Sequence, residues 1–539
     1  MSSRRARRPL AGSVTEKPSS VHLAPDGVFQ EGNETAPFAR SAPPSPRPPP
    51  SLRSMSSSGA PVGDVMTWGD NTCMVLGLTT RATGRKRPFP VALLNKSAPS
   101  GYTRILPRCV AAVASGVHSV AVSESGELWT WGVNDEGQLG RPIPRDDDEA
   151  PAVPGKVEVR GDLVGRAMAK GAPAPRVVAA AATDAATFAL LAGGVVVGCG
   201  VFKDDAELGF SPLNRGRQHG LARVAGPLLL PETDDEPVAG KKRKRDAAAP
   251  PPHASWPVAS VAAGNAHVVM LAEDPAPRRS AAAPRRVVLT AGAGAQGQLG
   301  RVGPRVSPSP RGVASMLAPA PVRMPRGAGR PVAVFAGGWH AFAITDEDVV
   351  VGWGLNNWGQ LGLDVDATRS AGGNGCAFVP RIVPALSKRG VAQLACGEHH
   401  TVARTRAGEV LTCGRYAYGR LGRAPPSGCA LEMGDAAVWE PAPVAFPPGV
   451  RAAEVAAGMK ESAATDAEGR VWMWGSGSGN MQGRGDDEED VMRPELVPEK
   501  EAYAHWRPKE QRIAAVSIGA QHVMAIATPG HAGEWAAAA

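Results

Sequence analysis

Histidine is the residue of this chain that recurs in one sequence context and could carry chemistry. Five histidines follow a short run of small residues and glycine and precede an alternating strand pattern: His118, His267, His340, His400 and His522. Imidazole binds metal ions and transfers protons near neutral pH. However, one histidine per repeat at a constant register places the side chains far apart, so they cannot surround one ion. We therefore expect structural hydrogen bonds and predict no metal site.

Other signatures of covalent chemistry are missing from the sequence. There is no Gly-x-x-x-x-Gly-Lys-Ser/Thr loop and no nucleophile elbow, so an intrinsic hydrolase is unsupported and no cofactor is predicted. The seven cysteines form no Cys-x-x-Cys pair, which disfavours a zinc module or a disulfide framework. No apolar run reaches the roughly 18 residues of a membrane span, so we expect an intracellular protein without a membrane partner.

Two half-motifs repeat along the chain. The first is an apolar strand ending in an aromatic or small residue plus glycine, followed by a polar turn that ends in Leu-Gly, as in residues 128–140. Its seven copies are marked by Gly69, Gly132, Gly200, Gly292, Gly354, Gly414 and Gly475. The second is the histidine motif, which also occurs seven times, with degenerate copies at 182–187 and 457–462. Units near 60 residues with four short strands are typical of propeller blades.

The order of the half-motifs predicts how the ring closes. The first glycine half, at 65–78, has no histidine half before it, and the last histidine half, at 516–527, has no glycine half after it. Each can complete the other, which would leave no free sheet edge. The fold class is therefore all-β: a seven-bladed propeller with one blade shared between the N- and C-terminal segments.

Composition divides the chain into a propeller at 63–528 and two tails. Residues 1–62 are basic and rich in Ser and Pro, and too poor in aromatic residues to offset their ordering entropy, so we expect a disordered tail. Residues 529–539 form a short C-terminal tail. Between blades three and four, residues 232–257 form an inserted basic loop.

Several runs then resemble a known family. Residues 134–141, Asn-Asp-Glu-Gly-Gln-Leu-Gly-Arg, together with 153–158, 263–271 and 418–422, are similar to the regulator of chromosome condensation family. The resemblance covers about 63–528, with all seven blades in the same order. It implies a chromatin-bound guanine-nucleotide exchange factor for the small GTPase Ran, with Ran on one propeller face and nucleosomes on the other. Such a factor breaks no covalent bond, since it stabilises the nucleotide-free GTPase.

The resemblance also implies site residues. A hairpin wedge that enters the phosphate-binding region of the GTPase falls on 201–209, with Phe202, Lys203, Asp204, Asp205 and Glu207. An acidic rim residue falls on Asp184, where it can draw the phosphate-binding lysine away. The family's acidic residue in blade four falls on Ala266 and its histidine in blade five on Gly359, which leaves the neighbours Asn265, Asn357 and Trp358 as candidates. The alternative is an exchange-inactive chromatin or protein-interaction scaffold.

Basic segments suggest the remaining partners. Ten arginines and no Asp, Glu or Lys lie between 275 and 330. The resemblance places Arg305 and Arg311 against the histone acidic patch and the N-terminal tail, with Arg4, Arg5, Arg7 and Arg8, on DNA. The run Lys241, Lys242, Arg243, Lys244 and Arg245 is typical of a nuclear import signal read by importin. We therefore predict a nuclear, chromatin-associated protein.

Overall fold

The computed structural model describes the greater part of the chain. The described residues are 61–79, 82–94, 102–164, 175–203, 207–214, 216–226, 255–274, 285–303, 309–369, 375–425, 427, 435–498 and 511–529. The chain divides into Met1–Ser45 and Pro46–Ala539, and all of these residues belong to the second unit. Residues 1–60 of the predicted N-terminal tail, the Lys241 to Arg245 run and residues 530–539 lie outside the described residues. None of the helices described is long and apolar enough to cross a membrane.

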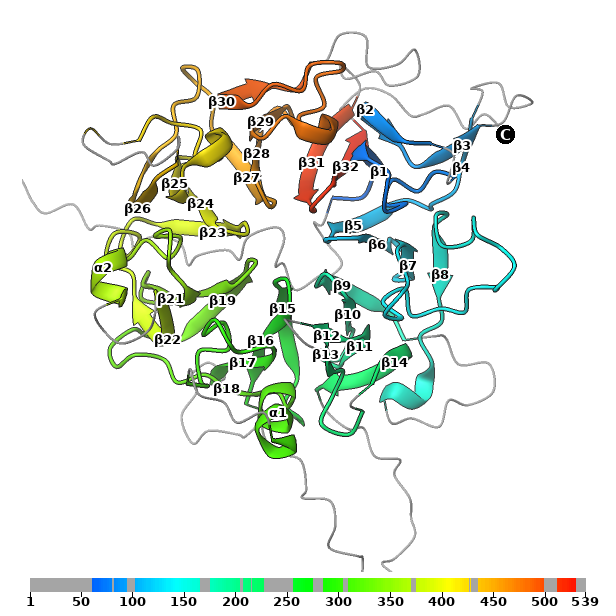
Figure 1. Ribbon diagram of the computed structural model, residues 1–539, viewed down its shortest axis with the longest axis horizontal. Helices are drawn as coiled ribbons and strands as arrows, with labels where there is room; N and C mark the ends of the chain where they lie inside the picture. Colours follow the sequence, from blue (N-terminus) through cyan, green and yellow to red (C-terminus); the bar gives the residue numbers. More distant parts are fainter. Residues whose placement is uncertain are drawn as a thin grey trace, which may run out of the picture. The chain divides into compact units, whose positions relative to one another are not determined.

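Seven four-stranded antiparallel sheets surround a central channel, so the predicted seven-bladed propeller is confirmed (Figure 1). Blade one contains β31 (Gln511–Ile518), β32 (His522–Pro529), β1 (Asp64–Asp70) and β2 (Gly84–Pro90). Blade two contains β5 (Cys109–Ala114), β6 (His118–Ser123), β7 (Leu128–Gly132) and β8 (Gly155–Val157). Blade three contains β9 (Val177–Ala182), β10 (Ala186–Leu191), β11 (Val196–Gly200) and β14 (Gln218–Ala225).

The other four blades follow in chain order. Blade four contains β15 (Val258–Ala263), β16 (His267–Glu273), β17 (Arg286–Gly292) and β18 (Ala320–Pro321). Blade five contains β19 (Pro331–Ala336), β20 (His340–Thr345), β21 (Val350–Leu355) and β22 (Cys376–Ile382). Blade six contains β23 (Val391–Cys396), β24 (His400–Thr405), β25 (Val410–Arg415) and β26 (Ala437–Pro443). Blade seven contains β27 (Ala452–Ala457), β28 (Glu461–Asp466), β29 (Val471–Gly475) and β30 (Val491–Leu496).

Short elements are inserted between the blade strands. Two extra hairpins are β3 (Ala92–Leu94) with β4 (Tyr102–Arg104), and β12 (Phe202–Lys203) with β13 (Glu207–Gly209). The described part of the chain also contains the helices α1 (Pro310–Leu317) and α2 (Val365–Thr368) and the 3-10 turns Gly161–Val164, Ala417–Gly419 and Ser478–Asn480.

Blade one is shared between the two ends of the described chain, as predicted. Strand β1 pairs antiparallel with β32 from Asp64↔Ala527 to Gly69↔His522. The indole nitrogen of the fully buried Trp68 donates a hydrogen bond to the carbonyl of Met481, 2.9 Å away. This blade is therefore joined to blade seven by a side-chain contact as well as by packing.

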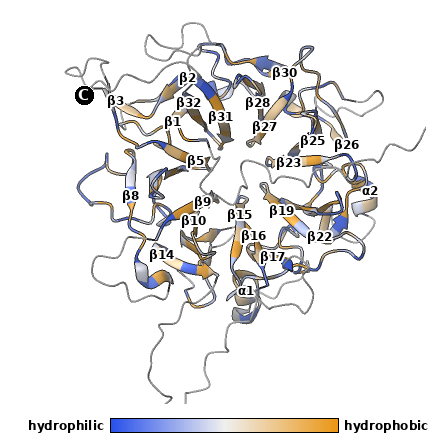
Figure 2. Ribbon diagram, turned by 180° about the vertical axis from the view of Figure 1, so that it is seen from behind, coloured by the Kyte–Doolittle hydropathy of each residue, from blue (hydrophilic) through white to orange (hydrophobic). Residues whose placement is uncertain are grey.

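The connections of every blade emerge at two faces. The strands of a blade are named A to D from the channel outward. Because the start of strand B pairs with the end of strand C, as in His118↔Gly132, the A–B turns and the C–D loops lie on one face, here called the A–B face. Figure 2 shows hydrophobic residues along the strands and hydrophilic residues in many of the connecting loops.

The repeated histidines join neighbouring blades. The Nε2 atoms of His118, His340, His400 and His522 lie 2.7–2.9 Å from hydroxyls of Thr187, Thr401, Ser462 and Ser119 on the next blade. These hydroxyls donate their own protons to C–D loop carbonyls, such as Gln138 O for Thr187, so the imidazole is the donor. Burial lowers the pKa of His118 to about 3, so the ring is neutral. The predicted structural role is confirmed at these four sites.

His267 is the exception among the repeated histidines. Its ring is fully buried, yet neither ring nitrogen has a hydrogen-bond partner within the described part of the chain. The next blade carries Ala341 where the four histidine-bonded interfaces carry serine or threonine. A buried polar group without a partner costs about 1–3 kcal/mol.

Replacing Ala341 by serine is expected to stabilise the propeller. The new hydroxyl can accept from His267 and donate to the carbonyl of Gln298, which already accepts from Trp353 Nε1 at 3.0 Å. Ser119 makes the corresponding pair of contacts between His522 and Val75 O. We expect A341S to raise the free energy of unfolding by about 1 kcal/mol in denaturant titration. The control A343S, on the same strand without such partners, should lower it, and equal effects of both variants would contradict this explanation.

Candidate functional site

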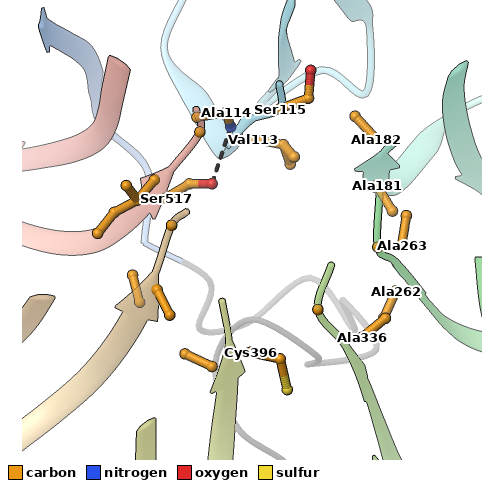
Figure 3. A pocket seen from close by; sticks show the side chains of 18 of the residues that line it. Val113, Ala114, Ser115, Ala181, Ala182, Ala262, Ala263, Ala336, Cys396 and Ser517 are labelled. Atoms are coloured by element: carbon orange, nitrogen blue, oxygen red, sulfur yellow. Dashed lines mark hydrogen bonds between the residues drawn. The ribbon is translucent and has the colours of Figure 1, made fainter. Parts of the chain in front are cut away.

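The central channel has walls of small residues and a polar mouth. Its volume is about 550 Å³, and the seven A strands and their turns line it. Figure 3 shows side chains of small residues along its wall, among them Ala181, Ala263 and Ala336. Ser517 Oγ accepts a hydrogen bond from the backbone nitrogen of Ala114, 3.0 Å away, which joins two of the A strands. The wall offers little chemistry, so polar function concentrates in the turns.

Asp184, Asn265 and Glu398 occupy one equivalent position in three A–B turns and line the channel. Backbone hydrogen bonds join the turns in series: Asp184 N to Asn265 O at 3.0 Å, Asn265 N to Gly338 O at 3.1 Å, and Glu398 N to Gly458 O at 3.2 Å. The turns touch so closely that a Cβ on Gly264 would lie 1.9 Å from a neighbouring carbonyl oxygen. Close approach, rather than a positive φ, therefore requires glycine at this position.

Asp184 has an unusual protonation equilibrium. Desolvation, and then the negative charge of Glu398, raise the pKa of Asp184 to about 7. Asp184 is nevertheless exposed and lines the channel. Its desolvation therefore comes from the turns that surround the channel mouth and not from burial in the blade core. Burial also raises the pKa of Glu398, against the charges of Arg420 and Arg415. The charge of Glu398 therefore disfavours the ionised form of Asp184.

The inserted hairpin of β12 and β13 is the predicted wedge, and aromatic residues fix its base. Phe202 pairs with Gly209, and Lys203 with Glu207. The rings of Phe188, Phe202 and Phe210 stack with centroids 5.6–6.3 Å apart. Phe202 is only 1% exposed, so its ring packs in the core and offers no surface for the predicted GTPase contact in this structure. An aromatic ring at the root of the insertion is more stable when it packs in the blade core than when it is exposed to water.

Glu136 joins the wedge to the preceding blade. Its carboxylate contacts Lys203 Nζ at 2.8 Å, within the hairpin, and Arg217 Nε at 2.6 Å, after the hairpin. Glu136 is 7% exposed, and the hydrogen bond from Lys203 is the largest cause that lowers its pKa. Lys203 therefore serves as an anchor in this structure. The repeated turn at 134–140 gave no signal for a partner 67 residues away.

Helix α1 supports the wedge from the side of blade four. Val313, Met316 and Leu317 belong to the same hydrophobic cluster as Phe202 and Phe210. Arg301, one of the ten arginines between 275 and 330, donates to the carbonyls of Met316 and Ala318 at 3.1 and 3.0 Å. That arginine is structural. Arg311 is exposed on α1, whereas Arg305, Asp204, Asp205 and the side chain of Glu207 lie outside the described parts.

Two positions without the family's polar residues are closed to a side chain of that kind. Ala266 is 1% exposed. Gly359 has φ +80°, and a Cβ there would lie 2.5 Å from the Cα of Trp439, so histidine cannot be placed at 359 without moving blade six. Its neighbours Asn357 and Trp358 are half-buried in the C–D loop of blade five. The fold thus brings Asp184, Asn265, the wedge and these two residues onto the A–B face.

Removing the Glu136 carboxylate is expected to loosen the wedge. In E136Q the cations at 203 and 217 lose their shared partner, and a charged hydrogen bond is worth about 1.5–3 kcal/mol. Hydrogen exchange of amides in 201–218 should accelerate by on the order of tenfold, with no change in blade five. The control is E127Q, because Glu127 pairs with Lys156 on the opposite, exposed side of blade two. Equal protection of 201–218 in E136Q and the parent chain would exclude the anchoring role.

The chain is similar over most of its length to proteins of one family. The family model of the RCC1-like domain matches residues 64–525. "Regulator of chromosome condensation" of Xenopus laevis is 31% identical over 473 residues, which are 87% of this chain and 90% of the relative. "Guanine nucleotide exchange factor SRM1" of Saccharomyces cerevisiae is 25% identical and covers 80% and 82% of the two chains.

Two solved structures share the fold. Yeast RCC1 (Prp20) bound to Kap60 has a TM-score of 0.68 at 22% identity and covers 93% of this chain and 97% of its own. Prp20p from Saccharomyces cerevisiae, described with its binding properties to Gsp1p and histones, has a TM-score of 0.66 at 24% identity, with coverage of 88% and 93%. The family match over most of the propeller, together with a relative above 30% identity, shows that this chain belongs to the RCC1-like domain family.

Proposed function

We propose that this chain is a guanine-nucleotide exchange factor for the small GTPase Ran, bound to chromatin in the nucleus. The observation that carries the proposal is a rigidly anchored hairpin on the same face as the Asp184 carboxylate. Relatives support it, because one is named as a guanine nucleotide exchange factor and the Prp20p structure is described with binding to Gsp1p and histones. In this proposal the A–B face receives the GTPase.

Nucleotide release requires only differential binding. The factor must bind the nucleotide-free GTPase more tightly than the loaded form, because equal affinity shifts no equilibrium. The Asp184 carboxylate can attract the lysine that holds the nucleotide phosphates, which weakens that contact. A wedge fixed by the phenylalanine cluster and Glu136 loses little conformational entropy on insertion, so more of the contact energy remains to displace nucleotide. No covalent step and no cofactor is involved.

The direct experiment is release of a fluorescent guanine nucleotide from Ran. Acceleration at micromolar protein is expected, and release at the spontaneous rate would remove the exchange hypothesis. In that case the alternative stands: an exchange-inactive chromatin or protein-interaction propeller. The buried Ala266 and the closed position at Gly359 favour that alternative, because both lack the polar groups that the family places there.

The other partners are part of the same proposal. Arg305 and Arg311 are proposed to meet the histone acidic patch, and Arg4, Arg5, Arg7 and Arg8 to meet DNA, because the planar arginine fork binds carboxylate or phosphate bidentately. The basic run from Lys241 to Arg245 is proposed to bind importin, and the related yeast RCC1 is seen bound to Kap60.

The rate of exchange should depend on pH through Asp184. Because the pKa of Asp184 is about 7, the carboxylate form increases as pH rises through that value, and the stimulated rate should increase with it. D184N should be slow and insensitive to pH in this range. E398Q removes a negative charge that raises the pKa of Asp184, so its profile should move to lower pH. Spontaneous release is subtracted at each pH, and coincident profiles for E398Q and the parent chain would exclude the coupling.

Nucleosome binding should weaken with salt and with charge reversal at the predicted arginines. Each phosphate contact contributes about 0.9 to the slope of log affinity against log salt. The double change Arg305→Glu and Arg311→Glu is expected to reduce nucleosome affinity by on the order of tenfold in a titration at fixed salt. Arg326→Glu is the control, since Arg326 is exposed and lies outside the predicted loop. An equal loss of affinity in the double variant and in the Arg326 control would reduce the effect to net charge.

A further inference from the structure

A second exposed surface lies on the A–B face, on blades six and seven. Tyr418 is 42% exposed and Met492 is 45% exposed, two of the five large hydrophobic residues that are exposed in the described part of the chain. They adjoin, because a Cβ on Gly419 would lie 2.7 Å from the sulfur of Met492. The Nζ atom of Lys460 lies 4.8 Å from the centroid of the Tyr418 ring. Tyr418, Met492 and Lys460 are called the Tyr418 patch below.

The backbone holds Tyr418 in a conformation that costs energy. Its φ is 62° and its ψ is 15°, in the left-handed region that residues other than glycine seldom adopt. The equivalent residues of the other C–D loops include Glu136 and Trp358, and neither has a positive φ. Glu136 turns inward to hold the wedge, and the Trp358 ring lies under the Arg415 guanidinium at 4.6 Å. Among these three loops, only the one with the strained backbone presents an exposed aromatic ring to solvent.

A buried arginine lies close to the Tyr418 ring. Arg420 is 1% exposed, and it donates to the carbonyls of Ala417 at 3.0 Å and Met459 at 3.2 Å. Its guanidinium carbon lies 5.5 Å from the centroid of the Tyr418 ring. Two cations, Arg420 and Lys460, therefore lie close to the Tyr418 ring. Tyrosine, methionine and arginine are the residue types enriched in the cores of protein interfaces.

The patch continues from the mouth of the channel. Met459 and Glu398 line the channel, and Lys460 follows Met459 in the A–B turn of blade seven. The patch belongs to blades six and seven, whereas the wedge belongs to blade three, so the two lie on opposite sides of the channel (Figure 1). Of the acidic groups nearby, Asp435 pairs with Arg415, Glu461 accepts from the backbone nitrogen of Lys460, and the charges of Glu398 and Glu461 act on Lys460 from a distance. Lys460 forms no ion pair within the described part of the chain, so it can still meet a partner's carboxylate.

We propose that the Tyr418 patch is a second docking surface for the GTPase that inserts against the wedge, and that it receives an apolar side chain flanked by a carboxylate. The proposal rests on the exchange function proposed above. A globular protein seated over the channel touches both sides of the mouth. The wedge then acts on the nucleotide, while the patch contributes affinity that is equal before and after release. Uniform binding of this kind affects KM and leaves kcat unchanged.

The sharpest test is Tyr418→Gly. Glycine adopts a positive φ without strain, so the variant should melt at or above the temperature of the parent chain while losing the ring. In stimulated nucleotide release, KM for the GTPase should increase by on the order of tenfold with kcat unchanged, as for an interface hot spot. M492A should raise KM in the same direction. Y418F keeps the aromatic ring beside Arg420 and Lys460 and should behave like the parent chain.

Ile382→Ala is the matched control. Ile382 is 36% exposed on the outer strand of blade five, where it pairs with Val351 away from the A–B face, and its loss should change neither constant. An unchanged KM in Y418G, with an active parent chain, would overturn the patch alone and indicate another occupant. A lower kcat with unchanged KM would assign the ring to the release step instead. If the parent chain neither releases nucleotide nor binds nucleotide-free GTPase in a direct titration, both the exchange function and the patch are excluded.

Discussion

The pairing of β1 with β32 holds the ring together, and every functional position depends on it. A propeller blade buries its two faces only against neighbouring blades, so a ring with one open joint would expose two sheets to water. The pairing joins residues about 460 positions apart, from Asp64 to Ala527, and places Trp68 against the carbonyl of Met481. Once closed, the seven A–B turns meet at one channel mouth. The relative positions of Asp184, the wedge and the Tyr418 patch are then fixed by the ring and not by any one blade.

The site uses the same contacts that build the ring, adapted at single positions. In blade two the C–D loop turns Glu136 inward, and its carboxylate holds the inserted hairpin of blade three. In blade six the corresponding loop adopts a left-handed residue and turns Tyr418 outward. Function therefore arises where a repeated loop departs from its repeat. The departures point to one face, which is the face that the GTPase meets in the proposed mechanism.

Repetition explains how much the sequence could predict. Seven copies of each half-motif determine the strand order, the shared blade and the structural role of four of the histidines, because each copy confirms the others. The positions of single side chains are harder to predict from the sequence. Phe202 is adjacent to acidic residues and was predicted as a contact, but its ring completes a cluster with Phe188 and Phe210 that no local pattern reveals. The partners of Glu136 lie 67 and 81 positions away in sequence, and only the folded ring brings them together.

The two closed positions bear on how exchange can work here. At Gly359 the positive φ and the backbone of Trp439 leave no room for histidine, and at Ala266 the neighbourhood is fully enclosed. Neither loss is compensated in place, so in the proposed mechanism polar contact with the GTPase comes from the remaining rim. That rim carries the acidic Asp184 on blade three, and on the other side of the channel it carries Glu398 and the basic Lys460 on blades six and seven. A partner with matching charges is therefore oriented as well as bound, since electrostatic complementarity fixes the register of a complex more than its total affinity.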